Sequence, residues 1–371
     1  MLKSLRIQNF RVFQDLTIDR LAPVNLIVGR NNIGKTTLLE ALNLYYSPNV
    51  FQNACDLLTQ RHEFSPQDSS LMVSWQNLFH QPQDQVARLQ ISEDLAAEED
   101  PILHPSTLSI VPKWMWKESR AEAGETHVIQ QQFGEEPPLD ADAIEVLVAY
   151  QGGDIIGYTD VRSRSDWGMP YKVHRAIQDR SAKLHCLLLP FGSKAVVGVD
   201  VAKLWDDAVL SDQEDRVLAL LRLVEPQLNK VRIIQDQTSG KRLVFVKIAD
   251  QKPVPLNRLG DGIARLFELA VSLVNLEAGA TLLVDEFDAG VHYSVLTDVW
   301  CTILETAQTL GVQVFATTHS WDCIQAFQEA TAEYPGVGNL VRLVQGKGGI
   351  RSVTFSDEKL AIITRQEIEV R

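Results

Sequence analysis

The chain begins with a pattern of alternating apolar and polar residues. The alternation from Leu5 to Phe10 predicts one β-strand, and Leu16 and Ile18 mark a second. The unbroken apolar run VNLIV at 24–28 is typical of a parallel strand that is buried on both faces. The N-terminal region is therefore expected to contain two antiparallel strands followed by a strand of a buried sheet.

A regular succession of helices and strands follows. After the glycine-rich sequence GRNNIGKT, apolar residues recur at helical spacing from 38 to 45. From about residue 215 the pattern predicts a helix, two strands joined by a turn at 238–240, and a long helix that begins near Leu256 and ends at Gly279. The strand TLLVDE, a helix from about 291 to 310 and the strand VQVFATTHS come next. Strands alternating with helices after a glycine-rich loop predict an α/β fold with a mostly parallel central sheet.

The middle of the chain is less regular, because proline, glutamine and acidic residues interrupt it. Two strand-like runs, at 144–150 and 184–191, indicate that it is folded at least in part. We therefore expect residues 1–50 and 215–371 to form one core with a central sheet and N-terminal antiparallel strands. Residues 51–214 are expected to form an inserted α+β subdomain with exposed loops.

Composition narrows the class of protein and its location. The 371 residues contain no apolar run near the ~18 that a membrane span needs, and no signal-peptide pattern. The four cysteines have no zinc-ligand spacing, which favours a reducing cytoplasm. A net charge of -13 opposes non-specific coating of DNA, so any contact with DNA is expected to be local or indirect. The segment 161–183, with six Lys/Arg against two Asp, is either a local phosphate-binding face or a solvated surface.

The loop after residue 28 matches the phosphate-binding pattern G-x-x-x-x-G-K-[ST]. Its glycines allow successive backbone N–H groups to point at an anion, and the helix that follows adds the positive end of its dipole. Lys35 would then reach the β and γ phosphates of a nucleotide, and the Thr36 hydroxyl would ligate Mg²⁺. An accidental glycine turn is the alternative, and the buried-type strand before the loop argues against it. The predicted nucleotide-binding residues are Gly29, Arg30, Asn31, Asn32, Ile33, Gly34, Lys35, Thr36 and Thr37.

Two carboxylates, Asp285 and Glu286, end the apolar run at 281–284. Unpaired charges there would cost several kcal/mol, so a cation or a hydrogen-bonding network is expected beside them. We predict that Asp285 holds Mg²⁺ through water and that Glu286 orients the attacking water; an acid pair that faces solvent is the alternative. His319, at the carboxyl end of the next strand, is predicted to bond to the γ-phosphate or the water, whereas His292 is expected to be structural.

The order of these motifs resembles the ABC-type ATPase family, and within it the OLD-like and RecF-like branch that includes SMC-type ATPases. The opening IQNFRVFQDLTI is similar to the first strands of that branch, and the pair Asn31-Asn32 is more similar to OLD proteins than to transporters. VDEFDAGVH resembles the Walker B acids followed by the D-loop, which contains Asp288, and ATTHS resembles the H-loop. The resemblance covers residues 1–46 and about 255–325 well.

The resemblance implies a homodimer in which two copies of the chain enclose ATP and Mg²⁺. The signature of one copy would face the phosphate-binding loop of the other and act in trans through its backbone N–H groups. Gly260 stands where the family has a serine, which puts in doubt how strongly the opposite γ-phosphate is sensed. The glutamine of the family's Q-loop has no unique counterpart in residues 51–110. The signature residues are Leu259, Gly260, Asp261 and Gly262.

OLD-family nucleases carry a Toprim nuclease domain after the ATPase. Only 52 residues follow His319, fewer than such a domain needs, and the D-x-D motif Asp140-Ala141-Asp142 precedes the Walker B strand. No nuclease activity is therefore expected in this chain. We expect an ATPase that regulates a separate effector, such as a nuclease or Toprim-like protein, in DNA repair or phage defence.

Two other classes of function share the phosphate-binding loop. A P-loop kinase or GTPase would act on a small molecule, and the signature and H-loop matches would then be coincidences. A non-hydrolysing interaction module would use the nucleotide only to stabilise its fold. The presence of both Lys35 and Glu286 argues against such a module.

Overall fold

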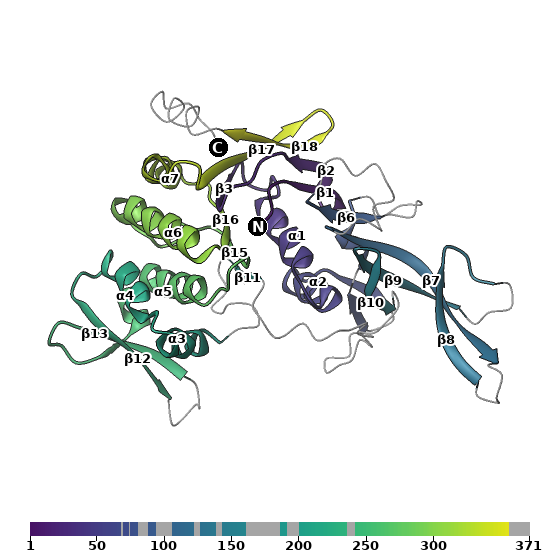
Figure 1. Ribbon diagram of the computed structural model, residues 1–371, viewed down its shortest axis with the longest axis horizontal. Helices are drawn as coiled ribbons and strands as arrows, with labels where there is room; N and C mark the ends of the chain where they lie inside the picture. Colours follow the sequence, from purple (N-terminus) through teal and green to yellow (C-terminus); the bar gives the residue numbers. More distant parts are fainter. Residues whose placement is uncertain are drawn as a thin grey trace.

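The computed structural model of the chain has two large β-sheets and two small ones among the residues it describes. A layer of helices covers one large sheet, and two further helices lie between it and the other (Figure 1). The described residues are 1–67, 70–73, 75–80, 88–93, 106–121, 127–138, 143–160, 186–190, 200–235 and 242–355.

The central sheet has six strands in the order β11-β15-β16-β3-β17-β18. All neighbours run parallel except β17 and β18, which pair antiparallel at one edge. Every residue of β3, β15 and β16 is buried, because helices or the second sheet cover both faces. The α/β fold with a mostly parallel central sheet is thus confirmed. The bounds are β3 (Val24–Val28), β11 (Cys186–Leu189), β15 (Thr281–Val284), β16 (Gln313–Thr317), β17 (Gly338–Gly346) and β18 (Gly349–Phe355).

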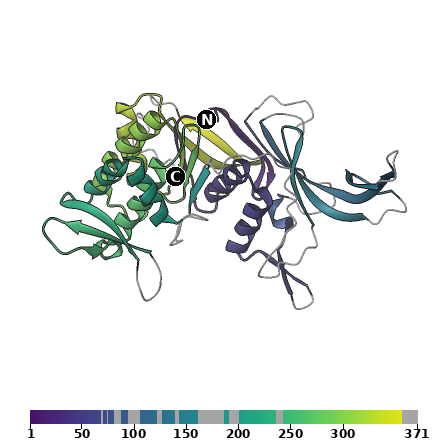
Figure 2. The ribbon, with the colours of Figure 1, turned by 60° about the horizontal axis from the view of Figure 1, so that its bottom comes forward.

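The second large sheet is antiparallel and has seven strands in the order β10-β9-β7-β6-β1-β2, with β8 paired to β7. β1 and β2 are the N-terminal antiparallel strands expected from the sequence. β7 and β8 run outward beyond the rest of this sheet (Figures 1 and 2). The bounds are β1 (Leu5–Phe10), β2 (Phe13–Ile18), β6 (Leu89–Ser92), β7 (Thr107–Ala121), β8 (His127–Gly134), β9 (Ala143–Gln151) and β10 (Asp154–Asp160).

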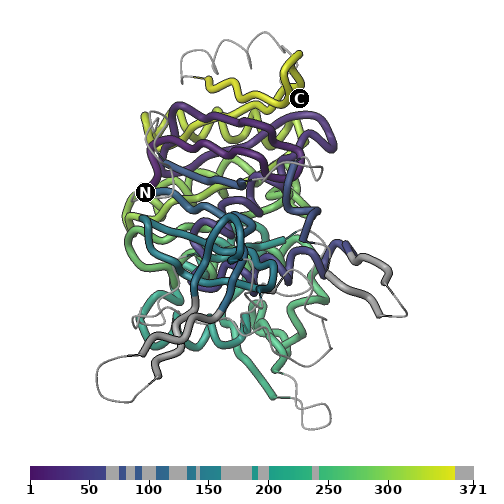
Figure 3. The backbone as a smooth tube through the Cα atoms, turned by 90° about the vertical axis from the view of Figure 1, so that its right-hand side faces the viewer, coloured from purple at the N-terminus to yellow at the C-terminus, as the bar shows by residue number. Residues whose placement is uncertain are grey.

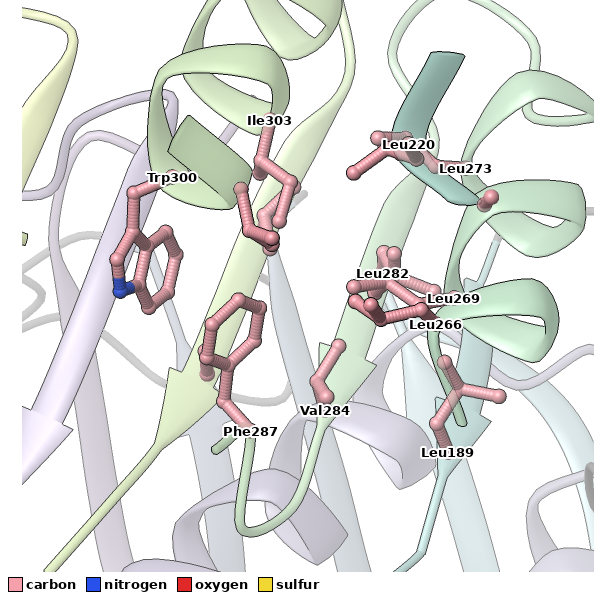
Figure 4. Packing of buried hydrophobic residues seen from close by; sticks show 14 of the residues in the cluster. Leu189, Leu220, Leu266, Leu269, Leu273, Leu282, Val284, Phe287, Trp300 and Ile303 are labelled. Atoms are coloured by element: carbon pink, nitrogen blue, oxygen red, sulfur yellow. The ribbon is translucent and has the colours of Figure 1, made fainter. Parts of the chain in front are cut away.

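Three helices lie side by side on one face of the central sheet: α5 (Asp261–Val274), α6 (Leu296–Leu310) and α7 (Trp321–Glu333) (Figure 1). Their apolar residues and those of the strands form one large core. In Figure 4, Leu266 and Leu269 of α5 lie against Leu282 of β15. The rings of Phe287 and Trp300 stack with their centroids 3.8 Å apart. This packing fixes the chain immediately after the acids at 285 and 286.

The opposite face of the central sheet is covered by α1 (Lys35–Tyr45), and α2 (Val50–Gln60) packs beside α1 between the two large sheets (Figure 1). A second core joins α1 residues such as Leu38 to Phe315 of the central sheet and Ile7 of the antiparallel sheet. At one end, the purple N-terminal strands run beside the yellow C-terminal strands in Figure 3. There, the Ser352 hydroxyl of β18 donates to the carbonyl oxygen of Thr17 in β2. The helix after the glycine-rich loop is thus buried on several sides.

The remaining elements form a small lobe beside α5. A three-stranded sheet in the order β12-β13-β14 packs against α3, α4 and α5, and Val231 and Val246 join the large core. Elsewhere, β4 and β5 pair as a separate hairpin next to α2. The bounds are α3 (Val201–Leu210), α4 (Glu214–Arg222), β12 (Leu228–Gln235), β13 (Arg242–Ile248), β14 (Val254–Pro255), β4 (Phe64–Gln67), β5 (Ser70–Val73) and the 3-10 helices Trp75–Leu78, Leu256–Leu259 and Tyr293–Val295.

The described parts of 51–214 contribute to several layers of the molecule. β6 to β10 complete the antiparallel sheet with β1 and β2, β11 forms the edge of the central sheet, and α3 packs on α5. The division of the chain into a core and an inserted subdomain stays a prediction. The turn at 238–240, the basic segment 161–183 and the motif at 140–142 lie outside the described residues.

One predicted helix differs from the structure in where it begins and ends. The helix predicted over 256–279 begins only at Asp261, because Gly260 with φ of 100° separates a 3-10 turn at 256–259 from α5, and it ends at Val274 rather than at Gly279. None of the described helices is both long enough and apolar enough to cross a membrane.

Candidate functional site

The glycine-rich loop leaves β3 and ends where α1 begins at Lys35. Gly29 and Gly34 have φ of 147° and 100°, a region that side chains rarely occupy. A Cβ atom at Gly29 would lie 2.7 Å from the Leu343 carbonyl oxygen, and one at Gly34 would lie 2.8 Å from Cγ2 of Val12. The loop therefore requires glycine at both positions, because neighbouring strands approach its backbone closely.

The other residues of the loop divide into exposed and anchoring positions. Arg30, Asn31 and Asn32 are exposed, and Asn32 has a left-handed backbone with φ of 62°. Ile33 and Thr37 are buried, and Ile33 packs in the second core. The exposed backbone of the loop is thus the part that can meet a ligand.

Lys35 folds back over this loop. Its ammonium group donates to the carbonyl oxygens of Gly29, at 2.8 Å, and Arg30, at 3.1 Å. Burial lowers the pKa of Lys35, and the charges of Asp285 and Glu286 oppose that shift. The lysine therefore shares one electrostatic environment with both acids, which are 250 residues away along the chain.

The Thr36 hydroxyl connects the loop to the acids directly. It donates to Oδ2 of Asp285 at 2.9 Å, across 249 residues of sequence. The other carboxylate oxygen, Oδ1, accepts a hydrogen bond of 2.6 Å from the Thr317 hydroxyl of β16. Asp285 is 7% exposed, so these two hydroxyls fix the orientation of a buried carboxylate. The two residues predicted to hold Mg²⁺ are thus in contact.

Glu286 and His319 approach each other at the same end of the central sheet. Nδ1 of His319 lies 3.9 Å from Oε1 of Glu286, and the two side chains are 53% and 32% exposed. Glu286 has a left-handed backbone with φ of 46°, which is rare outside glycine and asparagine. The acid and the histidine predicted to act together are therefore neighbours, and both are accessible.

The predicted D-loop and signature also lie against each other. The Thr318 hydroxyl donates to Oδ1 of Asp288 at 2.5 Å. A Cβ atom at Gly262 would lie 1.8 Å from the carbonyl oxygen of Gly290, so the N-terminus of α5 touches the D-loop backbone to backbone. Gly260 and Asp261 are exposed. In the described part of the chain, no hydrogen bond or ion pair joins residues 259–262 to the phosphate-binding loop of the same copy.

His292 caps a short 3-10 helix. Its ring Nδ1 lies 2.8 Å from the Ser294 hydroxyl and accepts from the Ser294 backbone N–H at the start of a short 3-10 helix.

Arg265 is a component that the sequence pattern did not reveal. From α5, its guanidinium donates to the carbonyl oxygens of Leu189, Pro190 and Asp285 at 3.1, 3.2 and 2.9 Å. Burial lowers its pKa, against the charges of Glu268 and Asp285. The signal in the sequence was an arginine among apolar residues of an amphipathic helix, but its acceptors are backbone atoms, which no side-chain pattern marks.

A glycine-rich loop between a central parallel strand and a buried helix, faced by acids from the strand next but one, defines a P-loop NTPase. The chain belongs to the family described as "AAA domain, putative AbiEii toxin, Type IV TA system", which matches residues 24–322. Membership of this family identifies the matched region as an ATPase-type AAA domain, a class of domain that binds a nucleotide. The finer likeness to the OLD and RecF branch stays a prediction.

Among curated proteins, the chain is similar to one from Helicobacter pylori named "ATP/GTP phosphatase". The two are 24% identical over 357 residues, which cover 90% of this chain and 89% of the relative. A shorter match, 40% identical over 47 residues, covers 13% of this chain and 22% of an uncharacterised protein from Methanocaldococcus jannaschii.

The solved structures that resemble this chain include heads of SMC proteins. One is an Smc head bound to the C-winged helix domain of ScpA, with a TM-score of 0.49 and 14% identity, covering 98% of this chain and 99% of that one. Another is the SMC head domain from Thermotoga maritima, with a TM-score of 0.42, 12% identity, and 96% and 99% coverage. The strand order and the family match, rather than these distant likenesses, carry the fold assignment.

Proposed function

We propose that this chain binds ATP with Mg²⁺ at the loop 29–37 and hydrolyses it to ADP and phosphate. One observation carries this proposal: the Thr36 hydroxyl of the loop meets the Asp285 carboxylate at 2.9 Å. A hydroxyl and a carboxylate oxygen are the hard ligands that Mg²⁺ prefers. The name of the Helicobacter relative supports hydrolysis and leaves the choice between ATP and GTP to be measured.

Each polar residue has a part in this reaction. The backbone of the loop and Lys35 bind the phosphates, and Thr36 and Asp285 would hold the Mg²⁺ ion, which neutralises charge on the phosphate oxygens. Glu286, one-third exposed, accepts a proton from the attacking water and orients it. His319 beside it bonds to the γ-phosphate or to the same water.

We further propose that two copies close on ATP, with residues 259–262 of each copy facing the phosphate-binding loop of the other. The exposure of Gly260 and Asp261 at the start of α5 supports this arrangement, because the first N–H groups of a helix have no acceptor within the helix and can bind an anion. Within one copy, Gly262 packs against the Gly290 backbone next to the D-loop. Each site would therefore be incomplete without the second copy.

The closing of the dimer is proposed to regulate a separate effector protein, such as a nuclease or Toprim-like protein, in phage defence or DNA repair. The family description, which names a toxin of a toxin–antitoxin system, supports a defence role. None of the four cysteines, all of which lie in the described part of the chain, forms a disulfide bond, which supports the proposed cytoplasmic location. Nuclease activity is assigned to the partner, and contact with DNA is proposed to be indirect or local.

Release of inorganic phosphate from ATP and GTP by the purified chain tests the enzymatic proposal. We expect Mg²⁺-dependent release that falls at least about a hundredfold in Glu286→Gln while nucleotide binding persists. Lys35→Ala is expected to lose nucleotide binding. Transfer of phosphate to a small metabolite, or equal rates in the wild type and Glu286→Gln, would contradict the proposal.

A further inference from the structure

Thr317 lies on the strand between β15, which leads into the two acids, and β3, which leads into the phosphate-binding loop. It is the last residue of β16, whose neighbours in the sheet are β15 and β3. Its side chain is fully buried at 0% exposure. A buried hydroxyl costs free energy unless it is hydrogen-bonded, so its partners indicate why a polar residue stands there.

Both partners of this hydroxyl belong to the proposed catalytic acids. Oγ1 of Thr317 donates to Oδ1 of Asp285 at 2.6 Å and accepts the backbone N–H of Glu286 at 2.9 Å. A hydroxyl has one proton to donate and lone pairs to accept, so both roles are used at once. The Thr317 carbonyl oxygen also accepts the N–H of Phe287 at 2.9 Å. One residue thus binds three successive residues of the acid-bearing segment.

The backbone of Glu286 makes this support necessary. A left-handed φ of 46° is strained for a residue with a side chain and persists only where neighbouring groups enforce it. The Thr317 hydroxyl holds the N–H of this residue, while the stacking of Phe287 on Trp300 anchors the next one. With its backbone fixed this way, the Glu286 side chain lies beside His319.

We propose that Thr317 is a positioning residue for nucleotide hydrolysis. Through one hydroxyl, it aims the Asp285 carboxylate at the metal position beside Thr36 and holds Glu286 in the conformation that presents its carboxylate to the water. This inference rests on the proposed hydrolytic function. Valine has nearly the same shape as threonine, so it fills this position of the strand but removes both hydrogen bonds.

The test compares Thr317→Val, Thr317→Cys and Thr317→Ser. Valine removes both hydrogen bonds, a thiol keeps weak ones, and serine keeps the hydroxyl. We expect kcat to fall about 10–100-fold in Thr317→Val, to fall less in Thr317→Cys, and to stay within about threefold of the wild type in Thr317→Ser. The dissociation constant of ATP measured without a divalent cation should change little, because the described hydrogen bonds of Thr317 with 285–287 reach the acid-bearing segment rather than the loop.

Two measurements do not depend on turnover. Without nucleotide, hydrogen exchange of the Glu286 amide should be roughly tenfold faster in Thr317→Val, since its acceptor is gone. With a non-hydrolysable ATP analogue, Mn²⁺ binding followed by electron paramagnetic resonance should weaken about 10–100-fold. Thr331→Val is the matched control: it removes another buried hydroxyl, which donates to the Gln328 carbonyl, and should leave both measurements unchanged.

The outcomes separate this inference from the proposed function. If the wild type hydrolyses neither ATP nor GTP, the proposed function fails. If the wild type is active and Thr317→Val matches it in kcat, amide exchange and Mn²⁺ binding, only the role of Thr317 is overturned. Should Thr317→Val not fold, the ranking of Thr317→Cys below Thr317→Ser carries the test, and equal behaviour of these two variants would overturn the proposal.

Discussion

At the scale of single residues, the site depends on backbone positions that few residue types can occupy. Glu286 is held left-handed, and Gly29 and Gly34 have positive φ with neighbouring atoms too close for a side chain. Gly262 requires glycine for a different reason, namely the close approach of a neighbouring segment rather than its own backbone conformation. A Cβ atom there would lie 1.8 Å from the Gly290 carbonyl oxygen. The packing of the signature on the D-loop therefore depends on the absence of one methyl group.

Gly262→Ala is expected to force α5 and the D-loop apart. Because the obstacle is backbone, relief requires a shift of a whole segment, and we expect a loss of stability of about 1–3 kcal/mol. Phosphate release should fall at least about tenfold, since Asp288 and the signature move together. Urea denaturation and steady-state turnover measure the two effects. Gly348→Ala is the control, because nothing lies within 4 Å of a Cβ atom there; equal effects of both substitutions would refute this explanation.

At the scale of secondary-structure elements, ion pairs tie the helix after the loop to its surroundings. Glu40 of α1 is 6% exposed and lies 3.1 Å from Nε of Arg11, in the turn between β1 and β2, and 2.8 Å from Nε of Arg61, after α2. Arg11 also pairs with Glu63 at 2.8 Å. These ion pairs join three segments at Glu40, which lies on the same helix as Lys35 and Thr36.

Glu40→Gln should therefore be strongly destabilising. It leaves the buried guanidinium of Arg11, itself 5% exposed, with less compensation, and breaking a buried pair in this way costs about 3–5 kcal/mol. Urea denaturation followed by circular dichroism measures the loss. Asp15→Asn, which breaks the more exposed pair with Arg6, is expected to cost about 0–1 kcal/mol. A similar small cost for both variants would show that the buried ion pairs do not hold α1.

The sequence predicted those elements whose signal is local. Strands such as Val24–Val28 and Thr281–Val284 appear as apolar runs, and the loop between Gly29 and Thr36 has a spacing that the chemistry of phosphate binding requires. The contact of Thr36 with Asp285 could be expected, because the carboxyl ends of parallel strands meet at one edge of the sheet.

What the sequence did not predict depends on contacts between distant backbone atoms. The three carbonyl acceptors of Arg265 lie at or just after the ends of two strands, and no side-chain pattern marks a carbonyl. The two hydrogen bonds of the Thr317 hydroxyl depend on the left-handed backbone of Glu286. The residue type at that position does not predict this conformation. The break at Gly260 was missed because a glycine between two apolar stretches is compatible with a continuous helix until its φ is known.

At the scale of the whole molecule, the central sheet separates two cores that hold the two halves of the proposed site. The phosphate-binding loop and α1 belong to the core shared with the antiparallel sheet. The signature and α5 belong to the core on the other face. The acids at the end of β15 lie between them: Asp285 contacts Thr36 on one side and, through its carbonyl oxygen, Arg265 on the other. A ligand at the loop and a second copy at α5 would therefore act on the same strand end.

The proposed shared site makes a prediction about mixtures of inactive variants. Lys35→Ala lacks a working phosphate-binding loop but keeps its signature, whereas Gly260→Ala strains a signature backbone at φ of 100° and keeps its loop. If residues 259–262 act on the nucleotide of the other copy, each mixed dimer contains one complete site. After random exchange of equal amounts, half of the dimers are mixed, so about a quarter of the wild-type phosphate release should return. Mixing each variant with itself is the control, and additive residual activity in the mixture would show that the chain hydrolyses nucleotide without help from a second copy.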